Sequence, residues 1–237
     1  MAFKENALYT PRPFEGMIVK VNLASQEVTN VTACLVAPNT VKFNSKQELF
    51  VVDRGKGEVV MINLTASDTD ANRKVIAQFP ANSIDNLAFD KVDRLFFSST
   101  TDASLTEVFP NGELRIVCCG DISIPMILAA IKDTHKVYTV YPGALCENDL
   151  EDDANTNIIT ASAVTLGPLA ESTSIDVWGK DLVFLSALSN TLMVWGLESE
   201  TSKMEMSFSA SGDVHPLNED LIVSDRPWVV YFAFSQQ

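Results

Sequence analysis

A block of four short apolar segments recurs along this chain, and this internal repeat restricts the fold more than any other feature of the sequence. Its clearest copy runs from Pro38 to Phe79, where segments rich in Val, Ile and Phe alternate with turns of Gly, Asn, Asp and Ser. Apolar segments this short, bounded in this way, are typical of an antiparallel four-stranded meander. One such sheet cannot bury both of its faces, so other copies must pack against it.

The copies align on one apolar position in the second segment of each block. PNTVKFNSKQELFVVD matches SIDNLAFDKVDRLFFSS, and weaker copies follow as PMILAAIKDTHKVYTVY, SIDVWGKDLVFLS and DVHPLNEDLIVSD. We call the aligned positions the anchors; they are Leu8, Leu49, Leu95, Val137, Leu182 and Leu221. A spacing of roughly 40 to 46 residues is that of the blades of a β-propeller.

We therefore predict an all-β protein, with residues 1–237 forming a single β-propeller domain. Complete blades are expected at about 38–79, 80–117, 120–166 and 168–208, and each end of the chain supplies three further strands. In this interpretation the first blade lacks its innermost strand and the last blade lacks its outermost one. Six blades, the first and last incomplete, account for every apolar segment, and five blades is the alternative.

Charge and hydropathy exclude several classes of partner. The formal net charge of -14 repels nucleic acid phosphates and anionic lipid, so we expect neither nucleic acid nor membrane as a partner. No apolar run is long enough to span a bilayer, and the first residues contain no apolar core of a signal peptide. We expect a cytoplasmic monomer, or a secreted protein if a signal peptide was removed, as the sequons at Asn30 and Asn63 would suit. The four cysteines form no C-x-x-C pair, and we expect them to be small buried hydrophobes.

The repeats APNTVKFNSKQELFVVDRGKGEVVMINL and SIDNLAFDKVDRLFFSSTTDASLTEVFPNGELRIV resemble the six-bladed propellers of the senescence-marker/gluconolactonase-like group, which are close to NHL and strictosidine-synthase-like repeats. The resemblance covers most of the chain. It implies one of several activities: metal-dependent lactonase or esterase hydrolysis, strictosidine-synthase-like chemistry, or assistance to hetero-Diels–Alder cyclisation as in fungal propellers. Family lactonases hold their metal with a Glu near the amino end. Glu15 lies in a turn between later strands and does not match it, so we expect no metal and no cofactor.

Candidate site residues follow from the geometry of a propeller, whose innermost strands surround the central axis. We call the space around this axis the hub. Residues at the start of each innermost strand, before its apolar part, would line the mouth of the hub and bind a substrate. With two aromatic residues of the terminal blades, this set is Asn39, Thr40, Asp85, Asn86, Met126, Ile127, Ser174, Tyr9 and Trp228. Asn and Asp at strand starts also commonly bond turn N–H groups, so a structural role is the alternative at each position.

Acid–base chemistry has one candidate pair. His215 lies two residues after Asp213 at the mouth of the last blade, and a His beside a carboxylate can serve as a general base near neutral pH. A satisfied structural His is the alternative. The other histidine, His135, lies in a tight turn and is expected to be solvated.

Three further features favour structural roles. Asp53 and Arg54 are expected to form an ion pair that ties neighbouring blades. Tyr9 and Trp228 are expected to pack on each other where the ring closes. The acidic segment from Glu147 to Asp153 is expected to be a solvated loop.

These observations leave two classes of function. The first is a small-molecule enzyme that holds a largely apolar organic substrate in the central channel without a metal, for example a cyclase of secondary metabolism that works by positioning. A metal-dependent lactonase or esterase is the alternative within that class. The second class is a non-catalytic propeller that binds a ligand or a protein.

Overall fold

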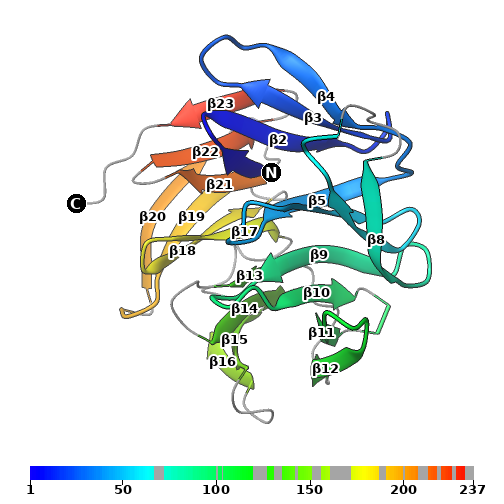
Figure 1. Ribbon diagram of the computed structural model, residues 1–237. Helices are drawn as coiled ribbons and strands as arrows, with labels where there is room; N and C mark the ends of the chain where they lie inside the picture. Colours follow the sequence, from blue (N-terminus) through cyan, green and yellow to red (C-terminus); the bar gives the residue numbers. More distant parts are fainter. Residues whose placement is uncertain are drawn as a thin grey trace.

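The computed structural model describes residues 1–66, 72–99, 101–102, 104–119, 127–130, 135–141, 144–150, 156–160, 172–186, 191–199, 201–207, 213–217, 220–225 and 228–232. Within these ranges every regular element is a β-strand, and the strands form six antiparallel sheets. Figure 1 shows the sheets following one another around a common centre in chain order, from blue through green to red. The predicted six-bladed β-propeller is confirmed.

The first three sheets each contain four strands in sequence order. Sheet 1 contains β1 (Ala2–Lys4), β2 (Ala7–Arg12), β3 (Met17–Asn22) and β4 (Val28–Thr32). Sheet 2 contains β5 (Pro38–Phe43), β6 (Leu49–Asp53), β7 (Glu58–Ile62) and β8 (Arg73–Gln78). Sheet 3 contains β9 (Ile84–Phe89), β10 (Leu95–Ser99), β11 (Ser104–Val108) and β12 (Leu114–Cys119).

The remaining sheets continue the pattern. Sheet 4 contains β13 (Ile127–Ala130), β14 (Lys136–Tyr141), β15 (Ala144–Asp149) and β16 (Thr156–Thr160). Sheet 5 contains β17 (Ser172–Trp178), β18 (Asp181–Ser186), β19 (Thr191–Gly196) and β20 (Thr201–Ser207). Sheet 6 has three strands within the described residues: β21 (Asp213–Leu217), β22 (Asp220–Asp225) and β23 (Trp228–Phe232).

The prediction that the first blade lacks its innermost strand is wrong. β1 pairs with β2, with Ala2 opposite Tyr9 and Phe3 opposite the anchor Leu8. A strand of three residues shows too little alternation to be recognised from sequence. Sheet 1 therefore has an inner strand beside the hub, as the other sheets do.

The inner strands close the ring. β1, β5, β9, β13, β17 and β21 adjoin in that order, and β21 adjoins β1. Within the described residues, each sheet is a separate antiparallel unit, and the ring closes by packing between β21 and β1. Sheets three positions apart, such as sheets 2 and 5, therefore face each other across the hub.

The cores lie between neighbouring sheets. One cluster joins sheets 1 and 2 through buried side chains that include Ile18, Val41, Leu49 and Val60. A second joins sheets 2 and 3 through Val52, Val59, Leu87 and Phe97. Because both faces of a blade are covered, β6 and β10 are buried along their whole length. Within the described residues, no helix is long and apolar enough to cross a membrane.

The turns between first and second strands form a repeated structure on the face of the ring opposite the hub mouth. Asp90 is buried and accepts hydrogen bonds from Val92 N, Arg94 N and Arg94 Nε, the last at 2.7 Å. The prediction that His135 is solvated is wrong: its Nδ1 lies 3.1 Å from Arg94 Nη2, and its side chain is 25% exposed. This contact joins the turns of sheets 3 and 4.

The predicted acidic loop is also partly wrong. Glu147 and Asn148 belong to β15, and only residues after Leu150 lie outside the described ranges. Glu147 accepts a hydrogen bond from Tyr138 Oη at 2.6 Å and forms an ion pair with Lys136 Nζ at 2.7 Å. Asn148 is buried and donates to Val137 O and Thr139 Oγ1. These carboxyl and amide groups therefore stabilise sheet 4.

Two cysteine predictions can be compared with the structure. Cys146 is buried, as expected, but Cys34 is exposed. Cys34 adopts a positive φ of 58°, and its carbonyl accepts a hydrogen bond from Arg73 Nη1 at 2.7 Å. Its place in the link between sheets 1 and 2 explains why it is not in a core.

Candidate functional site: the hub mouth

Strand pairing places four of the predicted substrate-binding residues, Thr40, Asn86, Ile127 and Ser174, at one level of their inner strands. Thr40 pairs with Val52, which lies three positions after the anchor Leu49 of sheet 2. One inner-strand residue in each of sheets 4, 5 and 6 pairs in the same register relative to its own anchor. In sheet 3, Asn86 lies at the same level beside a β-bulge, and its N–H donates to Ser98 Oγ at 3.2 Å. We call this the mouth level; it comprises Thr40, Asn86, Ile127, Ser174 and Asp213.

A second level lies two residues further along each inner strand. Each residue of this level pairs with the residue directly after the anchor of its sheet. We call it the ion-pair level, and it comprises Ala2, Lys42, Ala88, Ala129, Asp176 and His215. Half of these positions are alanine. His215 thus has the same register as Lys42 and Asp176.

An ion pair crosses the hub at this level. Lys42 Nζ donates to Asp176 Oδ2 at 2.7 Å, although the two residues belong to the opposite sheets 2 and 5. Their side chains are 19% and 18% exposed. Residues i and i+2 of a strand share a face, so the Thr40 position points to the hub as Lys42 does. The ion pair therefore forms a floor beneath the mouth level.

A polar cluster surrounds Asp85 at the edge of the mouth. Asn39 Nδ2 donates to Asp85 O at 2.8 Å and to Asp85 Oδ1 at 3.1 Å, and Thr40 Oγ1 donates to Asp85 O at 3.3 Å. Arg54 Nη1 lies 3.7 Å from Asp85 Oδ1. Three of the predicted mouth residues, Asn39, Thr40 and Asp85, thus meet between sheets 2 and 3.

The electrostatics of this cluster are unbalanced. Burial raises the pKa of the Asp85 carboxyl above its usual 3.8, and this effect outweighs the lowering by the Arg54 charge and by the Asn39 hydrogen bond. Arg54 Nε is buried and has no hydrogen-bond partner. An unpaired buried donor next to a poorly solvated carboxyl is unfavourable in the free protein, and an oxygen atom of a bound ligand would relieve it.

The predicted ion pair between Asp53 and Arg54 is wrong. Asp53 is fully buried and accepts hydrogen bonds from Val36 N and Ala37 N, at 3.0 Å and 2.9 Å at the nearest oxygens. It therefore fixes the link between sheets 1 and 2, whereas Arg54 points to sheet 3. Adjacent residues at a strand end point to opposite sides, so each contacts a different neighbouring sheet.

The other candidates lie in different parts of the structure. Ile127, Ser174, Asp213 and His215 have the register positions given above. Trp228 is the first residue of β23 and pairs with Asp225. Met126 lies outside the described residues.

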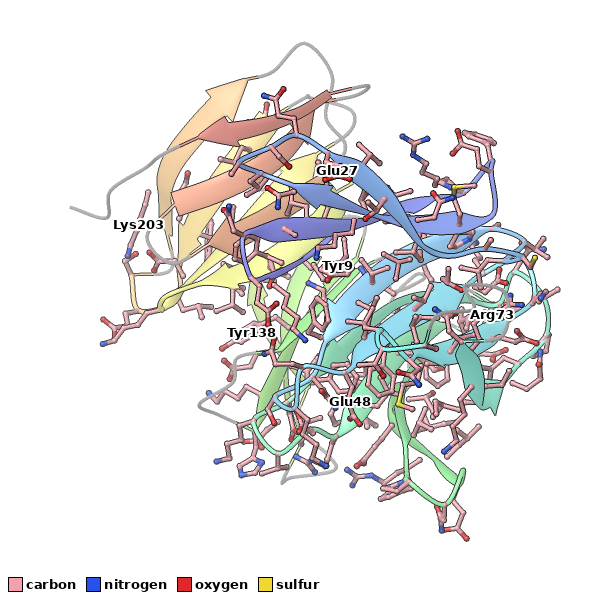
Figure 2. The ribbon with its side chains drawn as sticks, turned by 45° about the horizontal axis from the view of Figure 1, so that its top comes forward. Tyr9, Glu27, Glu48, Arg73, Tyr138 and Lys203 are labelled. Atoms are coloured by element: carbon pink, nitrogen blue, oxygen red, sulfur yellow. The ribbon has the colours of Figure 1, made fainter. Side chains whose placement is uncertain are left out.

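Tyr9 lies away from the mouth. It is buried between sheets 1 and 2 and packs edge-on against Phe43, with ring centroids 5.0 Å apart. Figure 2 shows it on the side of the first sheet that faces the second.

Sequence analysis missed Lys42, Asp176 and Arg54 as residues of the hub mouth. The sequence did contain a signal for Lys42 and Asp176. When the repeats are aligned, the position of Lys42 is occupied by alanine in sheets 1, 3 and 4 and by a large polar residue only in sheets 2, 5 and 6. Only the ring places those sheets opposite or beside one another. Arg54 showed no such signal, because its partner lies in the next blade.

Oxygen-bearing side chains at these positions could in principle also bind a metal ion. Within the described residues, no three His, Cys, Asp or Glu side chains gather as metal ligands would. Glu15 lies in the turn after β2 and is exposed, 3.7 Å from Arg12 Nη1. Since sheet 1 does have an inner strand, the expectation of a missing one no longer bears on metal binding.

Comparison with known proteins shows the fold. No family model matches the chain, and no curated protein matches it. Among solved structures, the nidogen/laminin complex matches with a TM-score of 0.75 and 13% identity, covering 87% of this chain and 78% of that one. Virginiamycin B lyase from Staphylococcus aureus matches with a TM-score of 0.70 and 9% identity, covering 100% and 84%. A streptogramin B lyase structure matches with a TM-score of 0.65 and 9% identity, covering 92% and 72%. At these identities the matches establish a propeller architecture and leave the function of this chain to its own residues.

Proposed function

We propose that the protein is a small-molecule enzyme that binds a largely apolar organic substrate at the hub mouth and needs no metal. The observation that carries this proposal is the mouth level itself: strand register brings hydroxyl, amide, carboxyl and apolar residues from five sheets to one end of the hub. A set of polar groups that converges with an apolar residue in this way could bind an organic ligand. Solved lyases on the same fold show that a propeller can carry an enzyme.

The roles follow from position. Asp213 at the mouth level and His215 at the ion-pair level belong to the same strand face, two residues apart. We assign proton transfer to His215, as a general base near neutral pH, with Asp213 as its acidic neighbour. Lys42 lies at the level of His215, where its ion pair with Asp176 would form the floor of the site beneath the substrate.

Binding falls to the cluster around Asp85. Asn39, Thr40 and Asp85 already bond one another, and Arg54 Nε offers an unpaired donor to a substrate oxygen. Such a site works chiefly by positioning, and it would suit a cyclisation of a reactive substrate better than a hydrolysis. We assign the reaction to the cyclase class on this basis.

The test uses extracts of cells that encode the protein. Purified protein and its His215→Asn variant are incubated with small-molecule extract, and mass spectrometry follows each compound. We expect one compound to be converted by the unchanged protein and at least about a hundredfold more slowly by the variant. His135→Asn, on the opposite face, is the matched control and should convert it at the normal rate. Conversion at an equal rate by His215→Asn, or no conversion at all, would contradict the proposal.

Metal independence has its own test. The protein is dialysed against a chelator and its metal content is measured. Retained conversion supports the proposal, whereas loss of conversion that calcium or zinc restores would support the lactonase or esterase alternative.

One observation favours the binding alternative. Phe14 is fully exposed in the turn between β2 and β3, and Val36 is 55% exposed in the link to sheet 2, on the same face as the hub mouth. If these side chains belong to one contiguous apolar patch, that patch would suit a protein contact. If capture experiments yield one stoichiometric protein partner that Phe14→Ser releases, this second function replaces the first.

A further inference from the structure

A pocket lies away from the hub, between sheets 1 and 2. It has a volume of about 170 Å³ and is lined by side chains that include Tyr9, Lys20, Thr29, Asn30, Leu64 and Asn72. Tyr9, Lys20 and Thr29 face one another across β2, β3 and β4 and form one wall. Leu64 and Asn72 flank the connection between β7 and β8 and form the other.

Two polar groups of this pocket, Asn72 Oδ1 and Lys20 Nζ, lack a partner among the described residues. Asn72 is 5% exposed; its Nδ2 donates to Val31 O at 2.8 Å, but its Oδ1 is buried and has no partner. Within the described part of the chain, Lys20 Nζ has neither an ion pair nor a hydrogen bond. Burial, with a smaller contribution from Glu5, raises the pKa of Tyr9, so its phenol is neutral and able to donate.

The unsatisfied groups define the chemistry of an occupant. An orphan amide oxygen requires a hydroxyl or amine donor, and a free ammonium prefers an anion. Leu64 and the ring of Tyr9 offer a small apolar wall for carbon atoms. The volume is less than that of pockets for drug-sized ligands, which excludes a large molecule.

We propose that this pocket binds a small hydroxycarboxylate, with the carboxylate on Lys20 and a hydroxyl on Asn72 Oδ1. The Tyr9 and Thr29 hydroxyls complete the contacts. The site is independent of the hub mouth, because Asn72, Lys20 and Thr29 lie on the third and fourth strands or their connections and not on inner strands.

Three probes with the same three-carbon skeleton separate the contributions. Glycerate carries both groups, glycerol has the hydroxyls without the carboxylate, and propionate has the carboxylate without the hydroxyls. Saturation-transfer NMR and titration of the whole protein measure binding. We expect glycerate to bind with a Kd in the millimolar range, at least about fivefold tighter than either control, because glycerol leaves Lys20 unpaired and propionate leaves the buried Asn72 Oδ1 unpaired.

Variants test the assignment of each contact. Lys20→Met keeps the aliphatic stem and should weaken glycerate about tenfold while leaving glycerol unchanged. Tyr9→Phe removes only the hydroxyl and should weaken glycerate a few-fold. Lys74→Met, at an exposed position of β8, is the matched control and should have no effect, and His215→Asn should bind glycerate normally. Circular dichroism confirms that each variant folds.

Two results would overturn the proposal. The first is glycerate binding no tighter than glycerol and propionate, which would leave the pocket to water. The second is glycerate binding that Lys20→Met and Tyr9→Phe both leave unchanged, which would place the ligand elsewhere.

Discussion

At the scale of single residues, the polar side chains of this protein divide into those whose bonds are complete and those whose bonds are not. Asp53 and Asp90 are buried carboxylates with several N–H donors each. Asp85 is a mostly buried carboxyl in an unfavourable environment, and Arg54 Nε and Asn72 Oδ1 are buried atoms without a partner. The first kind holds blades together, and the second kind marks the places where a ligand can improve the energy.

Replacement of Asp53 by Ala should destabilise the protein by about 3 kcal/mol, because two buried N–H groups lose charge-assisted hydrogen bonds. Urea unfolding measures this loss. The control is Glu15→Gln, which breaks an exposed ion pair and should change the free energy of unfolding by less than about 0.5 kcal/mol. Equal effects of the two substitutions would contradict the role given to Asp53.

Asp85 gives a prediction about pH. Its pKa is raised on folding, so the native state binds more protons than the unfolded state, and stability contributed at this site falls as pH rises from 3.8 through the raised pKa. Asp85→Asn removes the poorly solvated charge and should therefore raise the denaturation midpoint at pH 7 but not at pH 3. Thermal unfolding at the two pH values checks this. A midpoint lowered at pH 7 would mean that the Arg54 contact outweighs the cost of burial.

At the scale of elements, the repeat is built from hairpins whose turns need particular residues. Gly57 ends the turn between β6 and β7 with a φ of 71°, and Gly112 does the same between β11 and β12 with a φ of 86°. The two glycines differ in surroundings: a Cβ on Gly57 would lie 2.3 Å from Phe79 O, whereas one on Gly112 would meet nothing within 4 Å. Gly57 O also accepts a hydrogen bond from Phe79 N at 2.8 Å.

These two glycines form a matched pair of substitutions. Gly112→Ala should cost about 1 kcal/mol, the strain of a left-handed residue with a side chain. Gly57→Ala adds a clash with fixed backbone and should cost about 3 kcal/mol or more. Chemical denaturation of both variants measures the difference. Equal costs would show that the link between sheets 2 and 3 can move aside.

At the scale of the whole molecule, the ring brings together residues that the chain keeps far apart. Lys42 and Asp176 are 134 positions apart in sequence, and their ion pair crosses the hub. Contacts between neighbouring sheets hold each blade to the next, whereas this pair joins opposite blades. Its formation depends on all the intervening blades being in place.

A double-mutant cycle of Lys42→Met and Asp176→Asn measures that pair. We expect each single substitution to destabilise the protein and the two to couple by about 1 to 2 kcal/mol, since the charges are mostly buried. The coupling should change little with salt. Coupling below about 0.3 kcal/mol would show that the pair does not tie the hub.

Sequence reasoning located the strands well and their neighbours less well. The anchors Leu49 and Leu95 stand out because apolar alternation and turn residues recur around them, and both are buried in the second strand of a sheet. The three-residue strand β1 was missed because it has no measurable periodicity. Asp53 and Arg54 were paired because they are adjacent, although adjacency in a strand directs side chains apart.

Local pattern determined the propeller, its six sheets and the level of Thr40, Asn86 and Asp213 in their strands, because strand period, turn chemistry and repeat spacing are properties of neighbouring residues. The ring alone decided which levels meet across the hub, that Arg54 reaches Asp85, and that Tyr9, Lys20 and Asn72 enclose a pocket. The physical reason is that contacts between blades depend on how sheets twist and pack, and that information is spread over the whole chain.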